Sequence, residues 1–380
     1  MLTQKSADWL RLALTPGIGA RRGKSLLARF RTPGAILEAS LDKLSEVENI
    51  GRGVAKKIVE GRQRVDLGRQ IKLIEKNKVT LIPLDSEFYP ASLKSIIDPP
   101  LLLFVKGEIL PQDFFSIAMV GTRRASLYGR IMSENLSREL AEKGFTVVSG
   151  GARGIDTFSH QSALKANGRT LAVLGCGLDI VYPPENKKLF GEIEGKGAVI
   201  SEFPLTTRPD KGNFPARNRI ISGLSLGVVV IEAPHKSGAL ITVTHANEQG
   251  REVFSVPGRA DSFVSKGTNQ LLREGAKLVE SADDIIEELE PILINKLKEF
   301  KASQTQPEAL GVKESLSLES GLDDKSENRL YGLITRQAVT LDELIGKANM
   351  DVSRVSGILL NLQVRKLIRQ LPGKQFVRIV

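Results

Sequence analysis

Residues 149–154, Ser-Gly-Gly-Ala-Arg-Gly, have the composition of a loop that holds an anion. They follow an apolar run at 145–148 and precede a helix-like segment that begins near Asp156. Glycines let a backbone approach a ligand closely, and the amides at a helix N-terminus attract negative charge. Arg153 adds a guanidinium whose planar fork suits a phosphate. The pattern predicts a phosphate-binding loop, in which Asp156 either braces Arg153 or caps the following helix.

The loop does not match the motifs of nucleotide-dependent enzymes. It departs from Gly-x-Gly-x-x-Gly, and about twenty residues later, where a ribose-binding carboxylate would stand, another strand-like run begins at Thr170. It also lacks the Gly-Lys-Ser/Thr of a P-loop, and no nucleophile elbow is present. The three histidines and the single cysteine, Cys176, have no zinc-like spacing. We therefore expect no cofactor, no metal and no catalytic residue, and predict that the protein is not an enzyme.

Basic and small side chains also follow other apolar runs. Arg123 follows one run, and the triplet Lys-Ser-Gly at 236–238 follows another and opens a helix. A third segment, residues 213–221, places an aromatic residue beside two arginines and an amide. In a parallel sheet all these strand ends lie on one edge, where ligands bind. Several phosphate-sized sites in a row suit a nucleic-acid backbone, with Phe214 either stacking on a base or closing the core.

The elements that must position these residues lie within residues 81–290. Short runs rich in Val, Ile and Leu alternate there with helix-like stretches, and several runs are apolar at nearly every position. Such runs are typical of strands that are buried on both faces of a sheet. The alternation predicts an α/β core with a doubly wound, mostly parallel sheet.

Residues 1–80 are predicted to be an all-helical domain of helix-hairpin-helix or SAM-like type. Residues 14–30 and 47–62 share a pattern in which one helix ends at Gly-x-Gly and another begins with Lys or Arg. This resembles a helix-hairpin-helix pair, which reads a DNA backbone without sequence preference; a hairpin used only for packing or dimer contacts is the alternative. The secondary DNA-binding candidates are Gly17, Gly19, Lys24, Gly51, Gly53 and Lys56.

The C-terminal part is predicted to contain a linker and a winged helix. Residues 291–325 are polar and poor in aromatic residues, which predicts a flexible linker. Residues 326–380 contain two helix-like segments followed by a hairpin-like segment, as in a winged-helix domain. Arg354 stands near the start of the second helix, where a DNA reader would place it. Few other basic residues lie on that helix, so duplex DNA and a protein are equal alternatives as its partner.

The charge of the 380-residue chain, +10 in total, is concentrated in its terminal segments. Residues 1–80 hold 17 Lys and Arg against 8 Asp and Glu, whereas residues 81–290 hold 23 against 26. This excess indicates attraction to an anionic polymer, although a solvated surface would look the same. The single cysteine, the absence of a signal-peptide layout and the lack of a span-length apolar run predict a cytoplasmic protein without a membrane partner.

Five segments together closely resemble the DNA-processing protein A family (DprA, also called Smf). They are SGGARGID, GLDIVYPPEN, FPARNRIISGLS, SGALITVTHANEQGREVFSVPG and KGTNQLLREGA, which lie in order within about residues 85–290. The resemblance implies an extended Rossmann-like core that binds single-stranded DNA. It also implies protection of incoming strands in natural transformation and loading of RecA recombinase, with a second copy of the chain and single-stranded-DNA-binding protein as further partners.

The resemblance also implies which residues line the DNA pocket. These are Arg123, Gly150, Gly151, Arg153, Gly154, Phe214, Arg217, Asn218, Arg219, Lys236, Ser237 and Gly238. Thr157-Phe158 stand where the family usually has two alanines, and no basic or glycine position is lost. The RecA and dimer surfaces carry no motif that we can map.

Two other functions stay open at this stage. Phosphoribohydrolase enzymes on a related Rossmann core need a Pro-Gly-Gly-x-Gly-Thr loop followed by a glutamate, for which Glu248 is a poor substitute. A regulator of duplex DNA would instead act through the winged helix.

Overall fold

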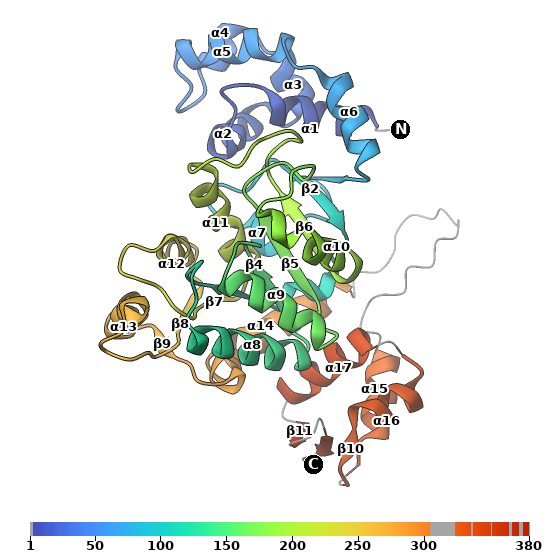
Figure 1. The fold of residues 1–380 in the computed structure, drawn as a ribbon. Coiled ribbons are helices and arrows are strands. Elements are labelled where there is room, and N and C mark those ends of the chain that lie inside the picture. Colours follow the sequence, from blue (N-terminus) through green and yellow to red (C-terminus); the bar gives the residue numbers. More distant parts are fainter. Residues whose placement is uncertain are drawn as a thin grey trace.

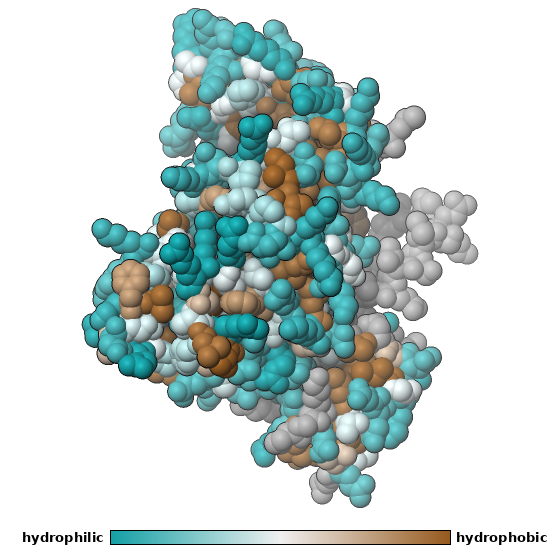
Figure 2. All heavy atoms as spheres, viewed as in Figure 1, coloured by the Kyte–Doolittle hydropathy of each residue, from teal (hydrophilic) through white to brown (hydrophobic). Residues whose placement is uncertain are grey.

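The fold is that of a computed structural model. It describes residues 3–304, 324–335, 337–350, 352–364, 367–371 and 375–379. Three parts follow one another along the molecule, with helices at one end, a large sheet in the middle and a small helical unit with its own sheet at the other end (Figure 1). Hydrophilic residues cover most of the helical end on the face seen in Figure 2, as its basic composition predicts.

The N-terminal part is helical, as predicted. Its helices are α1 (Gln4–Leu14), α2 (Ala20–Phe30), α3 (Pro33–Glu38), α4 (Leu41–Ser45), α5 (Arg52–Gln63) and α6 (Leu67–Lys76). Apolar residues on one side of each helix, including Trp9, Leu26 and Ile58, are buried in a core that continues into the sheet through Phe104. Because one core spans both parts, the helical part is packed onto the sheet rather than tethered to it.

The central sheet is doubly wound, as predicted, and Rossmann-like, as the family resemblance implied. Its order is β1 (Thr80–Pro83), β2 (Leu102–Gly107), β6 (Ala198–Ser201), β5 (Thr170–Leu174), β4 (Thr146–Ser149), β3 (Ser116–Val120), β7 (Gly227–Val230), β8 (Glu252–Ser255) and β9 (Lys277–Leu278). The strands from β6 to β9 are parallel, whereas β1 and β2 extend the sheet in antiparallel pairing. The chain moves outward from β3 in one direction and from β7 in the other, so the order reverses between these two strands.

Helices cover both faces of this sheet. They are α7 (Ala91–Lys94), α8 (Leu127–Glu142), α9 (Ile155–Lys165), α10 (Lys187–Lys196), α11 (Asn213–Leu224), α12 (Gly238–Glu248), α13 (Lys266–Arg273) and α14 (Ala282–Gln304), with 3-10 turns η1 (Pro111–Phe114), η2 (Pro184–Asn186) and η3 (Phe263–Ser265). Val228 and Val230 face the core that contains α11 and α12, whereas Val229 faces the core of α8 and α14. This alternation explains why β7 has no polar side chain on either face of the sheet.

The C-terminal unit is a winged helix, as predicted. It contains α15 (Asp324–Leu333), α16 (Leu341–Ala348) and α17 (Val352–Val364), with β10 (Val339–Thr340), β12 (Gln375–Arg378) and β11 (Ile368–Leu371) in one antiparallel sheet. Helix α14 crosses the start of the predicted linker, so residues 291–304 are helical; Leu289 and Leu293 bury its apolar side. The rest of that linker, residues 305–323, lies outside the described residues. Within the described ranges, no helix is both long and apolar enough to span a membrane.

His160 is enclosed in the core between α9 and the sheet. Its side chain is fully buried, its Nδ1 lies 2.6 Å from the Thr170 hydroxyl, and its Nε2 has no hydrogen-bond partner among the described residues. Burial, with a smaller contribution from the positive charge of Arg217, lowers the pKa of His160 to about 3. The imidazole is therefore a neutral packing group at neutral pH.

This buried imidazole should make the protein sensitive to mild acid. In the unfolded chain the ring takes up a proton below pH 6.5, whereas in the folded chain it resists protonation down to about pH 3. The stability that it contributes is therefore complete above pH 6.5 and is lost as the pH falls, by about 1.4 kcal/mol per pH unit. Denaturant titrations between pH 7 and 5 should show a shallower pH dependence for His160→Gln than for the wild type. Equal slopes would contradict a buried neutral ring.

Candidate functional site

A narrow pocket lies at the carboxyl ends of β3, β4 and β5, beside the reversal of strand order. Its lining residues are Arg123, Gly150, Ala152, Arg153, Leu174, Gly175, Cys176, Tyr182, Pro183, Phe214 and Arg217. The free space inside is about 20 Å³, which holds one water-sized group. A ligand larger than this must therefore lie at the mouth of the pocket and send only one small group, such as an anionic oxygen, inside.

Arg217 forms the base of the pocket. Helix α11 begins beside the glycine loop after β4, and the guanidinium of Arg217 lies so close to Gly150 that a Cβ there would be 1.7 Å from its Nη1. The residue is only 5% exposed, and its Nε has no hydrogen-bond partner among the described residues. Burial lowers the pKa of Arg217 to about 10, opposed by the negative charge of Asp156. The group stays charged at neutral pH and retains a donor for an anionic ligand.

Asp156 holds the glycine loop itself. Its carboxylate accepts hydrogen bonds from the amides of Gly150 at 3.1 Å and Ala152 at 3.2 Å. Burial raises the pKa of Asp156, and the positive charge of Arg217 opposes this rise. Both predicted roles, bracing Arg153 and capping α9, are thus wrong. Two loop amides are occupied by the protein's own carboxylate, so arginines supply the positive charge of the pocket.

Two glycines allow the loops to meet. Gly154 has a φ of +74°, and a Cβ there would lie 2.4 Å from the carbonyl oxygen of Thr122 in the loop after β3. Gly151 has a φ of +63°, and a Cβ there would lie 2.8 Å from the ring of Phe190. The close approach at Gly154 brings the loop that carries Arg123 beside the loop that carries Gly150, which creates the pocket.

An aromatic and cationic wall stands beside Arg217. The guanidinium of Arg123 lies 5.1 Å from the ring centre of Phe214, and the ring of Phe214 lies 5.7 Å from that of Tyr182 at an angle of 32°. Phe214 is half-buried, so the ring closes the start of α11 and also contributes to the wall. Tyr182 was not among the predicted site residues, although it lies in the segment GLDIVYPPEN.

Arg153 lies at the rim of the pocket and is paired. It forms an ion pair with Glu185 from the loop after β5, with Nη2 3.1 Å from Oε2, and about half of each side chain is exposed. This pairing raises the pKa of Arg153 and lowers that of Glu185. An anion that approaches the rim therefore meets a neutral pair, whose arginine can turn toward it.

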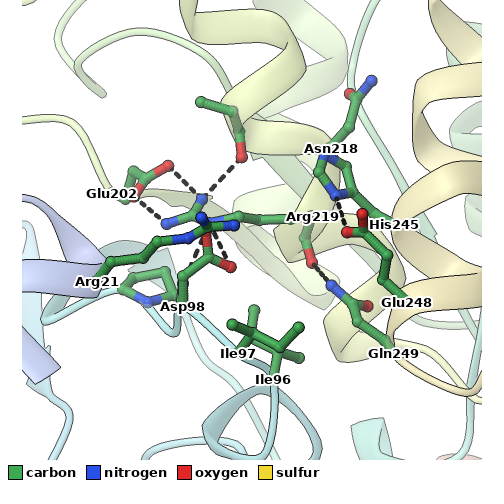
Figure 3. Close-up of polar contacts among 12 residues, drawn as sticks. Arg21, Ile96, Ile97, Asp98, Glu202, Asn218, Arg219, His245, Glu248 and Gln249 are labelled. Carbon is green, nitrogen blue, oxygen red and sulfur yellow. Dashed lines mark hydrogen bonds and ion pairs between the residues drawn. The ribbon is translucent and has the colours of Figure 1, made fainter.

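Arg219, which the resemblance also assigns to the DNA pocket, does not line this pocket. Its Nη1 and Nη2 donate to the two carboxylate oxygens of Glu202 at 2.6 and 2.7 Å, and its Nε lies 3.4 Å from the carboxylate of Asp98 (Figure 3). The residue is 6% exposed. Residues two apart on a helix point about 160° apart, so Arg217 and Arg219 cannot face one site. Phe214 and Arg217, three apart, share a face.

The remaining predicted residues lie beside the pocket without lining it. The side-chain amide of Asn218 donates to the carbonyl oxygen of Gly238 at 3.1 Å, which ties α11 to the start of α12. Ser237 is the N-cap of α12 and accepts from the amide of Ala239. Lys236 is exposed on the same loop. These groups form a polar surface next to the pocket on the same edge of the sheet.

The secondary candidates are exposed or half-buried, and one of them joins the helical part to the rest of the chain. Gly19 and Gly51 are the N-caps of α2 and α5, Gly17 turns the chain with a φ of +93°, Gly53 lies in the first turn of α5, and Lys56 is exposed beside Glu60. Lys24, in contrast, donates to the carbonyl oxygens of Ile97 at 3.1 Å and Ile96 at 3.5 Å. Its ammonium group therefore joins the helical part to the core.

Two further positions bear on the alternatives that the sequence left open. Arg354 of α17 donates to the hydroxyl of Ser326 within the winged helix. Glu248 lies on α12, where its Oε2 is 3.3 Å from Nδ1 of His245, and it does not line the pocket. In the part of the chain that the structure describes, no group of three or more His, Cys, Asp or Glu residues is placed to hold a metal.

Comparison with known families and proteins agrees with the sequence motifs. Residues 80–290 match the family model described as DNA recombination-mediator protein A, residues 314–374 match a DprA winged helix domain, and residues 10–64 match a SAM-like helix-hairpin-helix tandem. Protein Smf of Synechocystis sp. is 33% identical over 397 residues, which cover all of both chains.

Two solved structures are similar to this chain. DNA processing protein A from Streptococcus pneumoniae shares 34% identity with a TM-score of 0.67, over 76% of this chain and 99% of that one. DNA processing protein A from Helicobacter pylori, whose structure concerns the single-stranded DNA binding mode of that protein, shares 32% identity with a TM-score of 0.50, over 56% of this chain and 97% of that one.

The contact at Gly154 gives a prediction for the site's construction. In Gly154→Ala the added methyl group meets the carbonyl oxygen of Thr122 and the residue keeps an unfavourable positive φ. We expect the free energy of unfolding to fall by about 1–3 kcal/mol, measured by denaturant titration. Gly191→Ala is the matched control, because its Cβ meets nothing within 4 Å on α10, and should be neutral or slightly stabilising. Equal stability of Gly154→Ala and wild type would show that the loops do not need this contact.

Proposed function

The chain belongs to the DNA recombination-mediator protein A family, and from this we propose that it binds single-stranded DNA at the pocket between α11 and the loops after β3, β4 and β5. The observation that carries the proposal is the buried guanidinium of Arg217, which lines a space that fits one anionic oxygen and whose Nε has no hydrogen-bond partner among the described residues. The Helicobacter pylori relative, whose structure concerns single-stranded DNA binding, supports this ligand.

The pocket favours a phosphate flanked by an unstacked base. A phosphate oxygen would enter toward Arg217, with Arg123 as a second positive charge at the mouth. The wall of Phe214 and Tyr182 offers aromatic surface beside it. Bases can reach such a wall only when they are free of a complementary strand, which gives a physical reason for preferring single strands.

We further propose that the bound strand is protected and passed to RecA recombinase. The family resemblance supports this role, in which the protein holds DNA and performs no covalent chemistry. A DNA chaperone must release its strand, and affinity that rests on phosphate contacts can be exchanged when another protein neutralises the same backbone. The partner surfaces for RecA, for a second copy and for single-stranded-DNA-binding protein are not assigned to residues.

Variants of the pocket residues should distinguish the contribution of charge from that of stacking when DNA affinity is measured at a series of salt concentrations. Each phosphate contact contributes about 0.7 to the slope of log affinity against log salt for a single strand. We expect Arg217→Gln and Arg123→Gln each to weaken binding of a single-stranded oligonucleotide about tenfold and to make the slope shallower by about that amount. Phe214→Ala should weaken binding, by about 1–3 kcal/mol, with an unchanged slope. Fluorescence anisotropy measures both quantities.

Arg138→Gln is the matched control for lost charge. Arg138 lies near the C-terminal end of α8, away from the carboxyl ends of the strands, and about half of its side chain is exposed. The Arg138→Gln variant should bind the single-stranded oligonucleotide with the affinity and salt slope of the wild type. A duplex oligonucleotide that binds as tightly as the single strand, or pocket variants that bind like the control, would contradict the proposed site.

Loading of RecA is tested separately. On a single-stranded oligonucleotide coated with single-stranded-DNA-binding protein, the wild-type protein should shorten the lag before RecA begins ATP hydrolysis, and Arg217→Gln should not. The reason is that the strand must first be held at the pocket. An unchanged lag with the wild-type protein, under conditions where it binds DNA, would reject the loading role and leave DNA binding intact.

A further inference from the structure

Arg219 has an environment that its neighbour Arg217 lacks. Both residues lie on α11 and are nearly fully buried, but Arg219 is surrounded by acceptors. It forms a two-pronged ion pair with Glu202, its Nη1 donates to the carbonyl oxygen of Ala216 at 2.7 Å, and its Nε donates to the carbonyl oxygen of Asp98 at 3.1 Å (Figure 3). Its own carbonyl oxygen accepts from Gln249 at 3.0 Å. Each of its three nitrogens therefore donates to a protein acceptor.

The short segment at residues 96–98 is held from two sides. From one side, Arg219 contacts both the carbonyl oxygen and the carboxylate of Asp98. From the other side, Lys24 of α2 donates to the carbonyl oxygens of residues 96 and 97, and Arg21 of α2 lies 3.7 Å from the carboxylate of Asp98. Helix α2 also packs closely against Leu101, just after this segment, because a Cβ at Gly23 would lie only 2.4 Å from the Leu101 side chain. The segment therefore links the helical part to α11.

We propose that Arg219 is a positioning residue, which fixes α11 against Glu202 and against the segment that α2 holds. Through the helix it sets the places of Phe214 and Arg217, so the inference rests on the proposed single-stranded DNA site. A guanidinium fork that meets a carboxylate with both prongs restrains rotation as well as distance. Since α11 is one rigid helix, a rotation at Arg219 would displace the aromatic wall and the guanidinium of the pocket together.

Substitutions that change the charge in known ways distinguish a positioning role of Arg219 from a direct electrostatic role in DNA binding. Neutralising Glu202 removes a negative charge near a site for a polyanion, which by electrostatics alone strengthens DNA binding. Replacing Arg219 by lysine keeps the positive charge, which by electrostatics alone leaves binding unchanged. A positioning role predicts weaker DNA binding in both variants, because both changes break the two-pronged ion pair. Loss of affinity in both variants is therefore evidence for placement of the helix.

The experiment measures single-stranded oligonucleotide affinity and its salt slope for Glu202→Gln and Arg219→Lys in the full-length protein. We expect each variant to bind about tenfold more weakly, with the slope of the wild type, because no phosphate contact is lost. Glu248→Gln is the control. It removes an exposed carboxylate of α12, also drawn in Figure 3, that takes no part in the contacts between Arg219, Glu202 and Asp98. It should bind at least as tightly as the wild type.

Stoichiometric titration at high concentration shows whether each variant remains folded and competent. An endpoint equal to that of the wild type assigns the loss to affinity; where Glu202→Gln fails this test, Asp98→Asn replaces it. Wild-type affinity in Glu202→Gln and Arg219→Lys would overturn the inference, as would a slope shallower by about 0.7, which would mean that Arg219 contacts DNA. If the wild type binds no single strand or Arg217→Gln has no effect, the proposed function itself fails.

Discussion

The burial of one guanidinium, that of Arg217, constrains the rest of the site. A charged group at this depth is stable only beside a counter-charge, and Asp156 supplies it. The same carboxylate also holds the loop amides, which fixes the backbone at Gly150. Gly150 must then lack a side chain, because the guanidinium occupies the space of its Cβ. The glycine loop, the acidic residue and the helix therefore form one interdependent unit.

Two arginines two residues apart on α11 have different roles because a helix turns them in different directions. Arg217 faces the ends of β4 and β5, where an acceptor is missing, while Arg219 faces Glu202 and Asp98, where acceptors are complete. The sequence Arg-Asn-Arg contains no sign of this difference, since both arginines have the same chemistry. Only the position of the two carboxylates, 17 residues before Arg219 and on a more distant segment, distinguishes them.

The features that could be predicted from the sequence are those that leave a mark on composition or spacing. The fold class followed from apolar runs such as 227–230, because burial on both faces leaves a direct mark on composition. The pocket followed from glycines at strand ends, since a parallel sheet gathers those ends on one edge. The partners of Lys24 and Arg219 did not follow, because each depends on a tertiary contact. The helical continuation of α14 beyond residue 290 was also missed, since the polar composition of residues 291–325 as a whole predicted a linker.

The pocket volume, considered with the aromatic wall, limits how the proposed strand can be recognised. A cavity of about 20 Å³ cannot enclose a base, so no base identity can be read inside it. In the proposed complex, an oxygen common to every nucleotide enters the pocket, and a ring face that every base presents stacks outside on Phe214. A site built in this way distinguishes single strands from duplexes by the freedom of their bases and treats all sequences alike. That property agrees with the proposed role, in which the protein accepts any incoming strand.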